Sequence, residues 1–374
     1  MAAPNSLTLC HIDAERKFSG GEVQVFLLMH GLRERGHRSV LMAPPGSEAA
    51  LRAARDGFEV REVPMRSDLD LPGILAATRI LREVAPDLVH LHTGRAAWLG
   101  GLAARRANLP AIVTRRMDRD VRRGWRTRMI YGSLTCKVAA ISESVAAALE
   151  AGGVPKDRIA LIRSSIDPDA FAPRVSRREL RAELGVAEDS IVVLTLGALV
   201  QRKGLDVLFT ALEQLSTAGH VPDVWIAGEG AEQQALQSLA RAKRLARVRF
   251  LGRRSDVAEL LGAADLFAMP SRREGLGVAA LEAMAAGCPV VASGVGGLAE
   301  VVESEVSGLL VAPEDPAALA EALGRLITDP ALRARMSEAG RVRVAARHSA
   351  RAMVEAYEAL YRRVLAELDA ASSR

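Results

Sequence analysis

Two carboxylates separated by seven residues flank a glycine-rich turn in the second half of the chain. Residues 270–278 read Pro-Ser-Arg-Arg-Glu-Gly-Leu-Gly-Val, and Glu282 follows within an apolar run. Gly275 and Gly277 let the backbone approach a ligand closely, because glycine carries no side chain. A helix that begins near residues 276–278 would point free N–H groups and a partial positive charge at that ligand. The turn therefore predicts a binding site for a diphosphate.

Glu274 lies in the same turn, where its carboxylate would repel phosphates. The repulsion is avoided if Glu274 faces neutral hydroxyls or a developing cation, and a sugar supplies both, since glycosyl transfer passes through an oxocarbenium-like transition state. Glu282 lies about two helical turns further on and could accept hydrogen bonds from ribose hydroxyls. Both residues could instead be structural carboxylates. Glu282, however, stands among small apolar residues, where an unpaired charge is rarely buried.

A basic turn forms the second signal. Residues 197–204 read Gly-Ala-Leu-Val-Gln-Arg-Lys-Gly and follow an expected strand at 191–196. Arg202 and Lys203 come just before an expected helix start at Leu205, where they can neutralise phosphate. Glycosyl transfer without a metal requires such charge stabilisation of the departing diphosphate. The alternative is a loop with incidental basic residues.

Together these segments resemble the E-x7-E signature of retaining glycosyltransferases of family 4, which have the GT-B fold. The runs at 296–302 and 308–313 fit the same family, and the resemblance is strong over 190–315 and moderate elsewhere. It implies an α/β fold with two Rossmann-like, doubly wound domains that face each other across a cleft. It also implies that Glu274 contacts the transferred sugar, Glu282 the nucleotide ribose, and Arg202 with Lys203 the donor phosphates. The donor site would further include Gly275, Leu276 and Gly277.

Two shorter glycine turns are weaker signals. Gly20 and Gly21 precede an expected helix and resemble the family's N-terminal glycine loop, which closes on the donor. Gly228 and Glu229 follow an expected strand and resemble the family's G-x-G turn, near the nucleotide base. A plain tight turn is the alternative for both segments, and for Gly20 and Gly21 taken alone it is the favoured one, although the resemblance places all four residues in the donor site.

Candidate acceptor contacts lie in the first half. His92 ends an expected strand and could contact donor or acceptor, so it joins Glu274, Arg202 and Lys203 as a catalytic candidate; a satisfied structural histidine is the alternative. Many relatives carry histidine after the strand that matches 111–114, whereas this chain carries Arg115 and Arg116. We hypothesise that one of these arginines binds an anionic group of the acceptor.

Strand-like and helix-like segments alternate along the chain, which is typical of parallel sheets. Strands are expected at 6–12, 38–43, 88–92, 111–114, 138–141 and 159–162, and again at 191–196, 224–227, 248–251, 266–269 and 290–292. The predicted domains are an acceptor-binding domain at 1–170, a linker at 171–189 and a donor-binding domain at 190–345. A C-terminal helix at 346–374 is expected to pack back towards the N-terminal domain, because its apolar residues recur every three or four positions.

Composition limits the remaining possibilities. The 374 residues are 49% hydrophobic and 25% charged, which is typical of globular proteins. The three cysteines form no metal-binding pair, and the sequence shows no DxD motif after a strand, no Walker A motif, no HExxH and no GxSxG. We therefore expect no metal and no cofactor, with the nucleoside-diphosphate sugar as a substrate. Without a signal peptide or a long apolar run, a cytoplasmic location is expected.

The segment 115–128 carries seven arginines against Asp118 and Asp120, which could account for the whole net charge of +5. Such a cluster attracts phosphates, anionic lipid headgroups or an acidic acceptor. Peripheral contact with the inner face of the cytoplasmic membrane is therefore one expectation, and a solvated arginine-rich surface is the alternative. We expect no nucleic-acid partner.

These features predict a retaining transferase that moves a sugar from a nucleoside-diphosphate sugar to a glycan, a lipid-linked acceptor or a lipopolysaccharide-type acceptor, as in cell-envelope polysaccharide synthesis. No residue stands out as a covalent nucleophile, so we expect front-face attack on the sugar. The alternatives are an inactive nucleotide-sugar-binding paralogue and a GT-B epimerase or phosphorylase. The two carboxylates with Arg202 and Lys203 argue against both.

Overall fold

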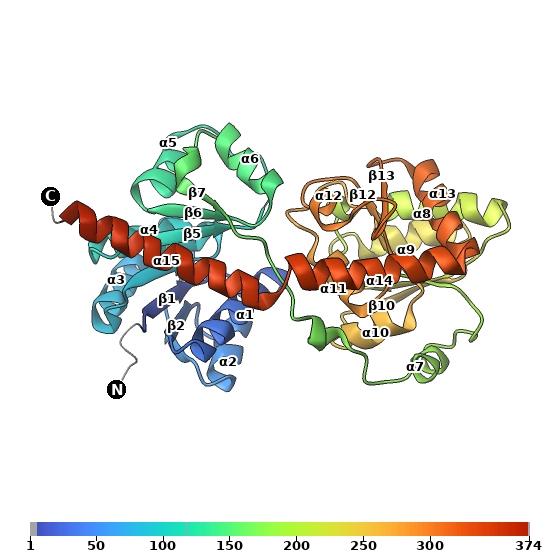
Figure 1. The fold of residues 1–374 in the computed structure, drawn as a ribbon, viewed down its shortest axis with the longest axis horizontal. Coiled ribbons are helices and arrows are strands. Elements are labelled where there is room, and N and C mark those ends of the chain that lie inside the picture. The colour runs from blue at the N-terminus through green and yellow to red at the C-terminus, as the bar shows by residue number, and fades with distance from the viewer. Residues whose placement is uncertain (1–5, 118, 373–374) are drawn as a thin grey trace. The chain divides into compact units, whose positions relative to one another are not determined.

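The computed structural model describes residues 6–117 and 119–372, and the polypeptide forms two compact units (Figure 1). Unit 1 contains the residues up to Ser165 together with those from Ala350 on, and unit 2 contains Ile166–Ser349. Asp118, which the charge count above includes, lies outside the described residues. No helix in the described part of the chain has the length and apolar character needed to cross a membrane.

A parallel sheet of seven strands forms the centre of unit 1, with the strand order β3-β2-β1-β4-β5-β6-β7 among the described residues. The inner strands are almost entirely buried, because helices cover a parallel sheet on both faces. The strands are β1 Thr8–Ile12, β2 Arg38–Ala43, β3 Glu59–Glu62, β4 Leu88–Leu91, β5 Ala111–Arg115, β6 Lys137–Ala140 and β7 Ile159–Leu161. The helices are α1 Gly20–Glu34, α2 Glu48–Arg55, α3 Leu71–Val84, α4 Gly94–Arg106, α5 Trp125–Arg128, α6 Glu143–Ala151 and α15 Ala350–Ser372.

The C-terminal helix α15 packs within unit 1. Its buried residues Met353, Tyr357 and Tyr361 share a core with strand residues of the sheet. A Cβ added to Gly31 of α1 would lie 2.5 Å from a methyl carbon of Val354, so the two helices approach closely at this glycine. The helix begins at Ala350 rather than at 346, because α14 of unit 2 continues to Arg347.

Unit 2 repeats the architecture with six parallel strands in the order β10-β9-β8-β11-β12-β13. Its core consists mostly of leucine, alanine and valine with a few aromatic side chains, Phe209, Trp225 and Phe267, which matches the scarcity of aromatic residues in the sequence. The strands are β8 Val192–Leu196, β9 Asp223–Ala227, β10 Val248–Gly252, β11 Leu266–Met269, β12 Val290–Ser293 and β13 Gly308–Val311. The helices are α7 Arg177–Glu183, α8 Leu205–Thr217, α9 Gln233–Ala242, α10 Val257–Ala263, α11 Val278–Ala286, α12 Leu298–Val301, α13 Pro316–Thr328 and α14 Pro330–Arg347.

Residues 171–189 are part of unit 2, which differs from the linker expected there. The reason is Arg181 of α7, whose side chain is fully buried. Its guanidinium donates to the carboxylate of Asp265 at 2.6 Å and to the backbone carbonyls of Ala263, Glu188 and Ser190 at 2.8–3.0 Å. A buried arginine is tolerated when its donors are all used in this way. The change of unit falls at Ser165 and Ile166 instead of at residue 170.

Candidate active site

The basic turn of unit 2 is pressed against the end of β11. After β8 the chain passes Gly197 and enters a short 3-10 turn, Gln201–Lys203, which ends at Gly204. Gly204 has a φ of +65°, and a Cβ there would lie 2.0 Å from the carbonyl oxygen of Pro270. Only glycine fits this left-handed position with so close a backbone neighbour. Arg202 and Lys203 are thereby held beside the residues that follow β11.

Three donors converge on one oxygen of Glu274. Its Oε1 atom accepts from Lys203 Nζ at 2.5 Å, from Ser271 Oγ at 2.9 Å and from Arg202 Nη1 at 3.3 Å. Glu274 is only 7% exposed, whereas half of the Arg202 side chain is exposed. Hydrogen bonds between charged groups are stronger than neutral ones, so the carboxylate and the two cations hold each other in place. The structure thus brings together three residues that the sequence singled out, and adds Ser271.

Backbone packing fixes the turn that carries Glu274. A Cβ added to Gly296 would lie 2.0 Å from the carbonyl oxygen of Glu274, and one added to Gly297 would lie 2.5 Å from that of Gly275. The Gly297 amide also donates to the Glu274 carbonyl at 3.3 Å. Gly277, with a φ of +94°, caps the N-terminus of α11. The N-terminus of this helix therefore begins at the turn, as the sequence predicted.

Glu282 lies on α11, one residue after the buried Leu281, and is itself half-buried. Burial raises the pKa of its carboxyl to about 7, and the charge of Lys203 opposes this rise. Among the described residues its carboxyl group has no hydrogen-bond partner, although part of it is shielded from solvent. A ligand hydroxyl would provide the missing partner.

Arg272 connects the turns that follow β8 and β11, and it is not among the residues that the sequence predicts for the site. Its guanidinium makes a bidentate pair with Asp206 on α8 at 2.7 and 2.8 Å, and donates to the carbonyl of Gln201 at 2.8 Å. Its Nε donates to Glu314 at 2.9 Å, and its backbone amide donates to the carbonyl of Arg202 at 2.8 Å. Asp206 raises the pKa of Arg272 further above its usual range. Arg272 thereby sets the separation between Lys203 and Glu274.

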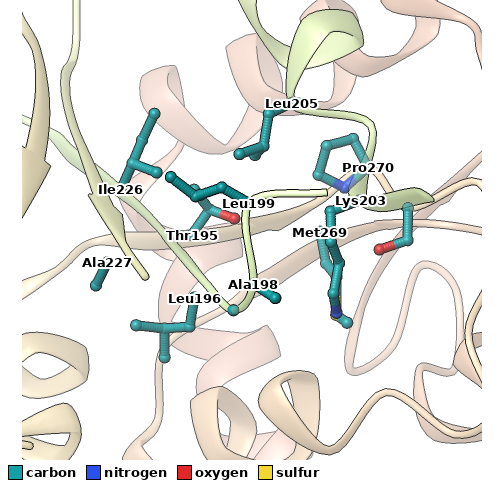
Figure 2. A pocket seen from close by; sticks show the side chains of 12 residues that line it. Thr195, Leu196, Ala198, Leu199, Lys203, Leu205, Ile226, Ala227, Met269 and Pro270 are labelled. Atoms are coloured by element: carbon teal, nitrogen blue, oxygen red, sulfur yellow. The ribbon is translucent and has the colours of Figure 1, made fainter. Parts of the chain in front are cut away.

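The glycine turn after β9 packs onto the loop after β8. A Cβ added to Gly228 would lie 1.9 Å from the carbonyl oxygen of Gly197, and the Leu199 amide donates to the carbonyl of Glu229 at 2.9 Å. A narrow pocket lies at the ends of β8, β9 and β11, and Figure 2 shows Lys203 and Met269 on one side of it and Ile226 on the other. The tight-turn role of Gly228 is thus visible in the contacts. A role for Glu229 in nucleotide binding stays a prediction.

His92 belongs to a buried cluster in unit 1. Its Nδ1 accepts from Arg116 Nη2 at 3.3 Å, because arginine can only donate, and its Nε2 lies 3.0 Å from His11 Nδ1. His90 contacts Tyr361 Oη and Thr114 Oγ1, both at 2.7 Å. Both ring nitrogens of His92 are therefore engaged within the protein. This arrangement favours the structural interpretation of His92 over contact with a substrate.

Burial lowers the pKa of all three histidines well below the usual range, and that of His11 to about 3, with the charge of Arg116 adding to the effect. The cluster is therefore neutral near pH 7. One ligand atom from each histidine lies within 4.8 Å of the others, which is close enough for a metal site. A divalent cation would face the Arg116 guanidinium and would displace the hydrogen bonds of His90, so the donor set does not fit a metal.

Arg115 and Arg116 point in different directions. Arg116 donates to the carbonyl of His92 at 2.9 Å and lies beside Gly21, its Cδ 3.7 Å from the position of a Cβ there. Arg115 instead donates to the hydroxyl of Tyr131 at 3.0 Å and to the carbonyl of Arg119 at 2.5 Å. Ser19 and Glu22 form a capping box at the start of α1, so the turn of Gly20 and Gly21 opens a helix as expected. Only Arg116 lies at this helix N-terminus.

Asp13 also lies at this edge of unit 1, and the sequence analysis did not select it. It follows β1 and is almost fully buried, with its Oδ1 accepting from the Glu15 amide at 2.8 Å. Burial raises the pKa of its carboxyl to about 7, Glu22 adds to the rise, and Arg116 opposes it. No local motif marks Asp13, because its environment comes from distant segments.

Comparison with known proteins places both halves of the chain in one family. The model described as "Glycosyl transferases group 1" matches residues 176–343, and the model "Glycosyltransferase Family 4" matches residues 18–170. A D-inositol 3-phosphate glycosyltransferase of Xylanimonas cellulosilytica is 31% identical over 76% of this chain and 74% of its own length. The lipopolysaccharide core biosynthesis glycosyltransferase LpsD of Rhizobium meliloti is 30% identical over 93% of this chain and 96% of its own length.

Solved structures show the same fold. Anabaena HepE, in complex with UDP and glucose, superposes with a TM-score of 0.84 over 95% of this chain and 99% of its own, at 23% sequence identity. The expected doubly wound α/β architecture is thereby confirmed. The sequence identities, the matched residues and the fold agree that this chain belongs to the family 4 glycosyltransferases, with the GT-B fold.

Proposed function

We propose that this glycosyltransferase retains the configuration of the sugar that it transfers and takes that sugar from a nucleoside diphosphate bound to unit 2. One observation carries the proposal: Lys203 and Arg202 converge on the buried Glu274 at the N-terminus of α11. This cluster combines cations for a diphosphate with a carboxylate for sugar hydroxyls. Gly275, Leu276 and Gly277 contribute the helix start, and Glu282 offers an unpaired carboxyl for the ribose.

The proposed chemistry needs no covalent intermediate. The bond between the anomeric carbon and the diphosphate oxygen breaks, and Lys203 and Arg202 neutralise the charge that develops on the leaving group. The acceptor hydroxyl forms the new bond on the same face of the sugar and passes its proton to the departing phosphate oxygen. Glu274 would exchange its contact with the cations for sugar hydroxyls. Because two side-chain cations supply the charge, the proposal requires no metal.

For the acceptor we propose a glycan, lipid-linked or lipopolysaccharide-type molecule with an anionic group that Arg116 binds. Arg116 lies at the N-terminus of α1 beside Gly21, where the helix dipole also favours an anion. Relatives named as acting on an inositol phosphate and in lipopolysaccharide core synthesis are compatible with such an acceptor. Replacing Arg116 with Gln should raise the KM for the acceptor, whereas Arg115→Gln, which removes a similar charge directed elsewhere, should leave it unchanged. Equal effects would contradict this assignment.

The proposed location is the cytoplasm, with peripheral contact at the inner face of the cytoplasmic membrane through the arginines of 115–128. This contact would bring unit 1 to an acceptor that is anchored in the lipid.

The donor site can be tested by thermal shift. The protein is heated with UDP, GDP, ADP or CMP and their sugar conjugates in the presence of a chelator, since a ligand that binds the folded state raises the melting temperature. We expect a shift with one nucleoside diphosphate that Arg202→Ala and Lys203→Ala abolish. Lys243→Ala is the matched control, because Lys243 also pairs with a glutamate of unit 2, Glu213 at 2.6 Å.

The thermal shift, followed by activity assays with the donor that it identifies, separates the alternatives. A shift that appears only with added divalent metal would contradict metal independence. Donor binding without transfer or hydrolysis would indicate an inactive paralogue, and dependence on inorganic phosphate would indicate a phosphorylase. The anomeric configuration of the product, followed by NMR during turnover, tests retention directly.

A further inference from the structure

Large apolar side chains are exposed together on one part of unit 1. Leu69 is 86% exposed, Leu71 68%, Leu75 55% and Trp125 64%. Leu69 precedes α3, Leu71 and Leu75 lie one turn apart on it, and Trp125 starts the short helix α5. Isolated exposed leucines are ordinary, but a group of this kind marks an interaction surface.

Direct contacts join the two segments that carry these side chains. Arg126 donates to the carboxylate of Asp68 at 2.7 Å, and Trp98 Nε1 donates to the carbonyl of Asp68 at 2.9 Å. The ring centroids of Trp98 and Trp125 are 5.6 Å apart, and the Arg126 guanidinium lies 5.2 Å from the Trp98 ring. Residues 66–75 and 122–128 therefore form one continuous surface, which we call the amphipathic surface.

The charge of the amphipathic surface is strongly positive. Its exposed arginines are Arg66, Arg122, Arg123, Arg126 and Arg128. Among these described residues only Arg126 forms an ion pair, and its partner is Asp68. The carboxylate of Asp70 accepts hydrogen bonds from the backbone amides of Arg66 and Gly73 at the start of α3. Most of the cationic groups thus remain available to an external anion.

We propose that the amphipathic surface binds an anionic phospholipid bilayer, with its leucines and Trp125 entering the interface and its arginines contacting lipid phosphates. A polyanion such as RNA would use the arginines but leave the three leucines in water. An apolar protein partner would bury the leucines at the cost of the unpaired charges. An anionic bilayer satisfies both groups, since apolar insertion and headgroup attraction add.

This inference deepens the proposed function by naming the membrane contact and extending it from 115–128 to Leu69, Leu71 and Leu75. The chain runs from Arg116, the proposed acceptor residue, directly into the segment that carries Trp125. Docking on the bilayer would therefore bring the acceptor side of unit 1 next to lipid headgroups.

Vesicle cosedimentation tests the surface without any sugar transfer, so its failure is distinguishable from failure of the proposed function. We expect the full chain to bind phosphatidylcholine vesicles only when they contain phosphatidylglycerol. Arg122→Gln with Arg123→Gln should weaken this binding about thirtyfold at low salt, and Leu69→Ala with Leu71→Ala about tenfold. Leu51→Ala with Arg55→Gln is the matched control, because both residues are exposed on α2 and should not matter.

Tryptophan fluorescence provides a second measurement. The chain has three tryptophans, and Trp225 is fully buried in unit 2. In a Trp98→Phe variant, Trp125 is therefore the one tryptophan whose fluorescence can respond to vesicles. Anionic vesicles should shift its emission to the blue, and brominated lipids should quench it. Absence of binding to anionic vesicles, or binding that the leucine variant retains in full with no blue shift, would overturn the proposal. Self-association that Leu69→Ala with Leu71→Ala abolishes would assign the surface to a second copy of the chain instead.

Discussion

The two units place polar side chains at the same edge of similar sheets, yet the two clusters differ in kind. In unit 1 His11 of β1, His90 of β4 and His92 just after β4 face one another, are buried and are neutral near pH 7. In unit 2 Glu274 faces two cations, one of which is half-exposed. A buried neutral cluster can satisfy all its hydrogen bonds internally, whereas Lys203 and Arg202 can exchange their carboxylate for a phosphate. In this protein, polar side chains at a sheet edge point to ligand binding where a ligand can replace their hydrogen-bond partners, as in unit 2, and to a structural role where it cannot, as in unit 1.

The largest expected effect lies in the Glu274 cluster. Replacing Lys203 with Ala should lower kcat about 100- to 1000-fold, as loss of one group that stabilises transition-state charge does elsewhere. Steady-state kinetics with the donor identified by thermal shift measures the effect, with Lys243→Ala as control. If Lys203→Ala retained normal kcat, the contrast between the two units would lose its main support.

Arg272 tests whether the arrangement of the cluster matters as well as its members. Replacing Arg272 with Ala should lower kcat/KM for the donor about 10- to 100-fold, because Lys203 and Glu274 would lose their relative position. The KM for the acceptor should stay unchanged. Arg325→Ala is the matched control, since Arg325 makes a similar bidentate pair with Glu305, at 2.8 Å for both bonds. If the two variants lost a similar share of kcat/KM, Arg272 would contribute to the stability of the fold and not to the arrangement of the cluster.

The pH dependence of stability should sharpen the comparison further. The pKa of Glu282 is raised to about 7, so its folded form keeps a proton that the unfolded chain loses above its ordinary pKa of 4.5. Stability therefore falls as pH rises through this window. Glu282→Gln should remove this pH dependence. The free energy of unfolding of the variant should therefore rise by about 1–3 kcal/mol relative to that of the parent protein between about pH 5 and about pH 8. Denaturant unfolding at the two pH values measures the difference.

An Asp13 variant is the matched control for Glu282, and the quantity compared is the affinity for the nucleotide. Asp13 of unit 1 has a carboxyl whose pKa is also raised to about 7. Asp13→Asn should therefore change the pH dependence of unfolding in the same direction but leave nucleotide affinity unchanged, whereas Glu282→Gln should weaken nucleotide binding. Loss of nucleotide affinity in the Asp13 variant alone would reverse the assignment of the donor site to unit 2.

The smallest expected effect on turnover is at His92. His92→Gln should lower the free energy of unfolding by about 1–3 kcal/mol, because His11 would lose a buried hydrogen-bond partner. The thermal shift caused by the donor and the kcat should stay unchanged. A large fall in kcat with normal stability would make His92 catalytic after all and would break the distinction drawn between the clusters.

Local sequence patterns predicted most strands, including the edge strands β7 and β10, but not β3 and β13 at the opposite edges of the two sheets. β3 has the sequence Glu-Val-Arg-Glu and is partly exposed at the sheet edge, so its charged residues show no apolar pattern that would predict a strand. The segment of β13 is marked in the sequence only by its resemblance to the family. Residues 171–189 resemble a linker in sequence, because a charged helix next to prolines is typical of exposed segments. The burial of Arg181 depends on Asp265, which is distant in the sequence.

The sequence by itself determined the alternation of strands and helices and the glycine turns, because backbone geometry and short-range spacing are local properties. It also predicts Arg202, Lys203, Glu274 and Glu282 as donor-site residues, which stays a prediction. The tertiary structure decided which side chains meet. It paired Arg272 with Asp206, buried Asp13, closed the histidines of unit 1 on one another and turned Arg115 away from Arg116. These outcomes depend on charge and desolvation between segments that only folding brings together, and no periodicity in the chain encodes them.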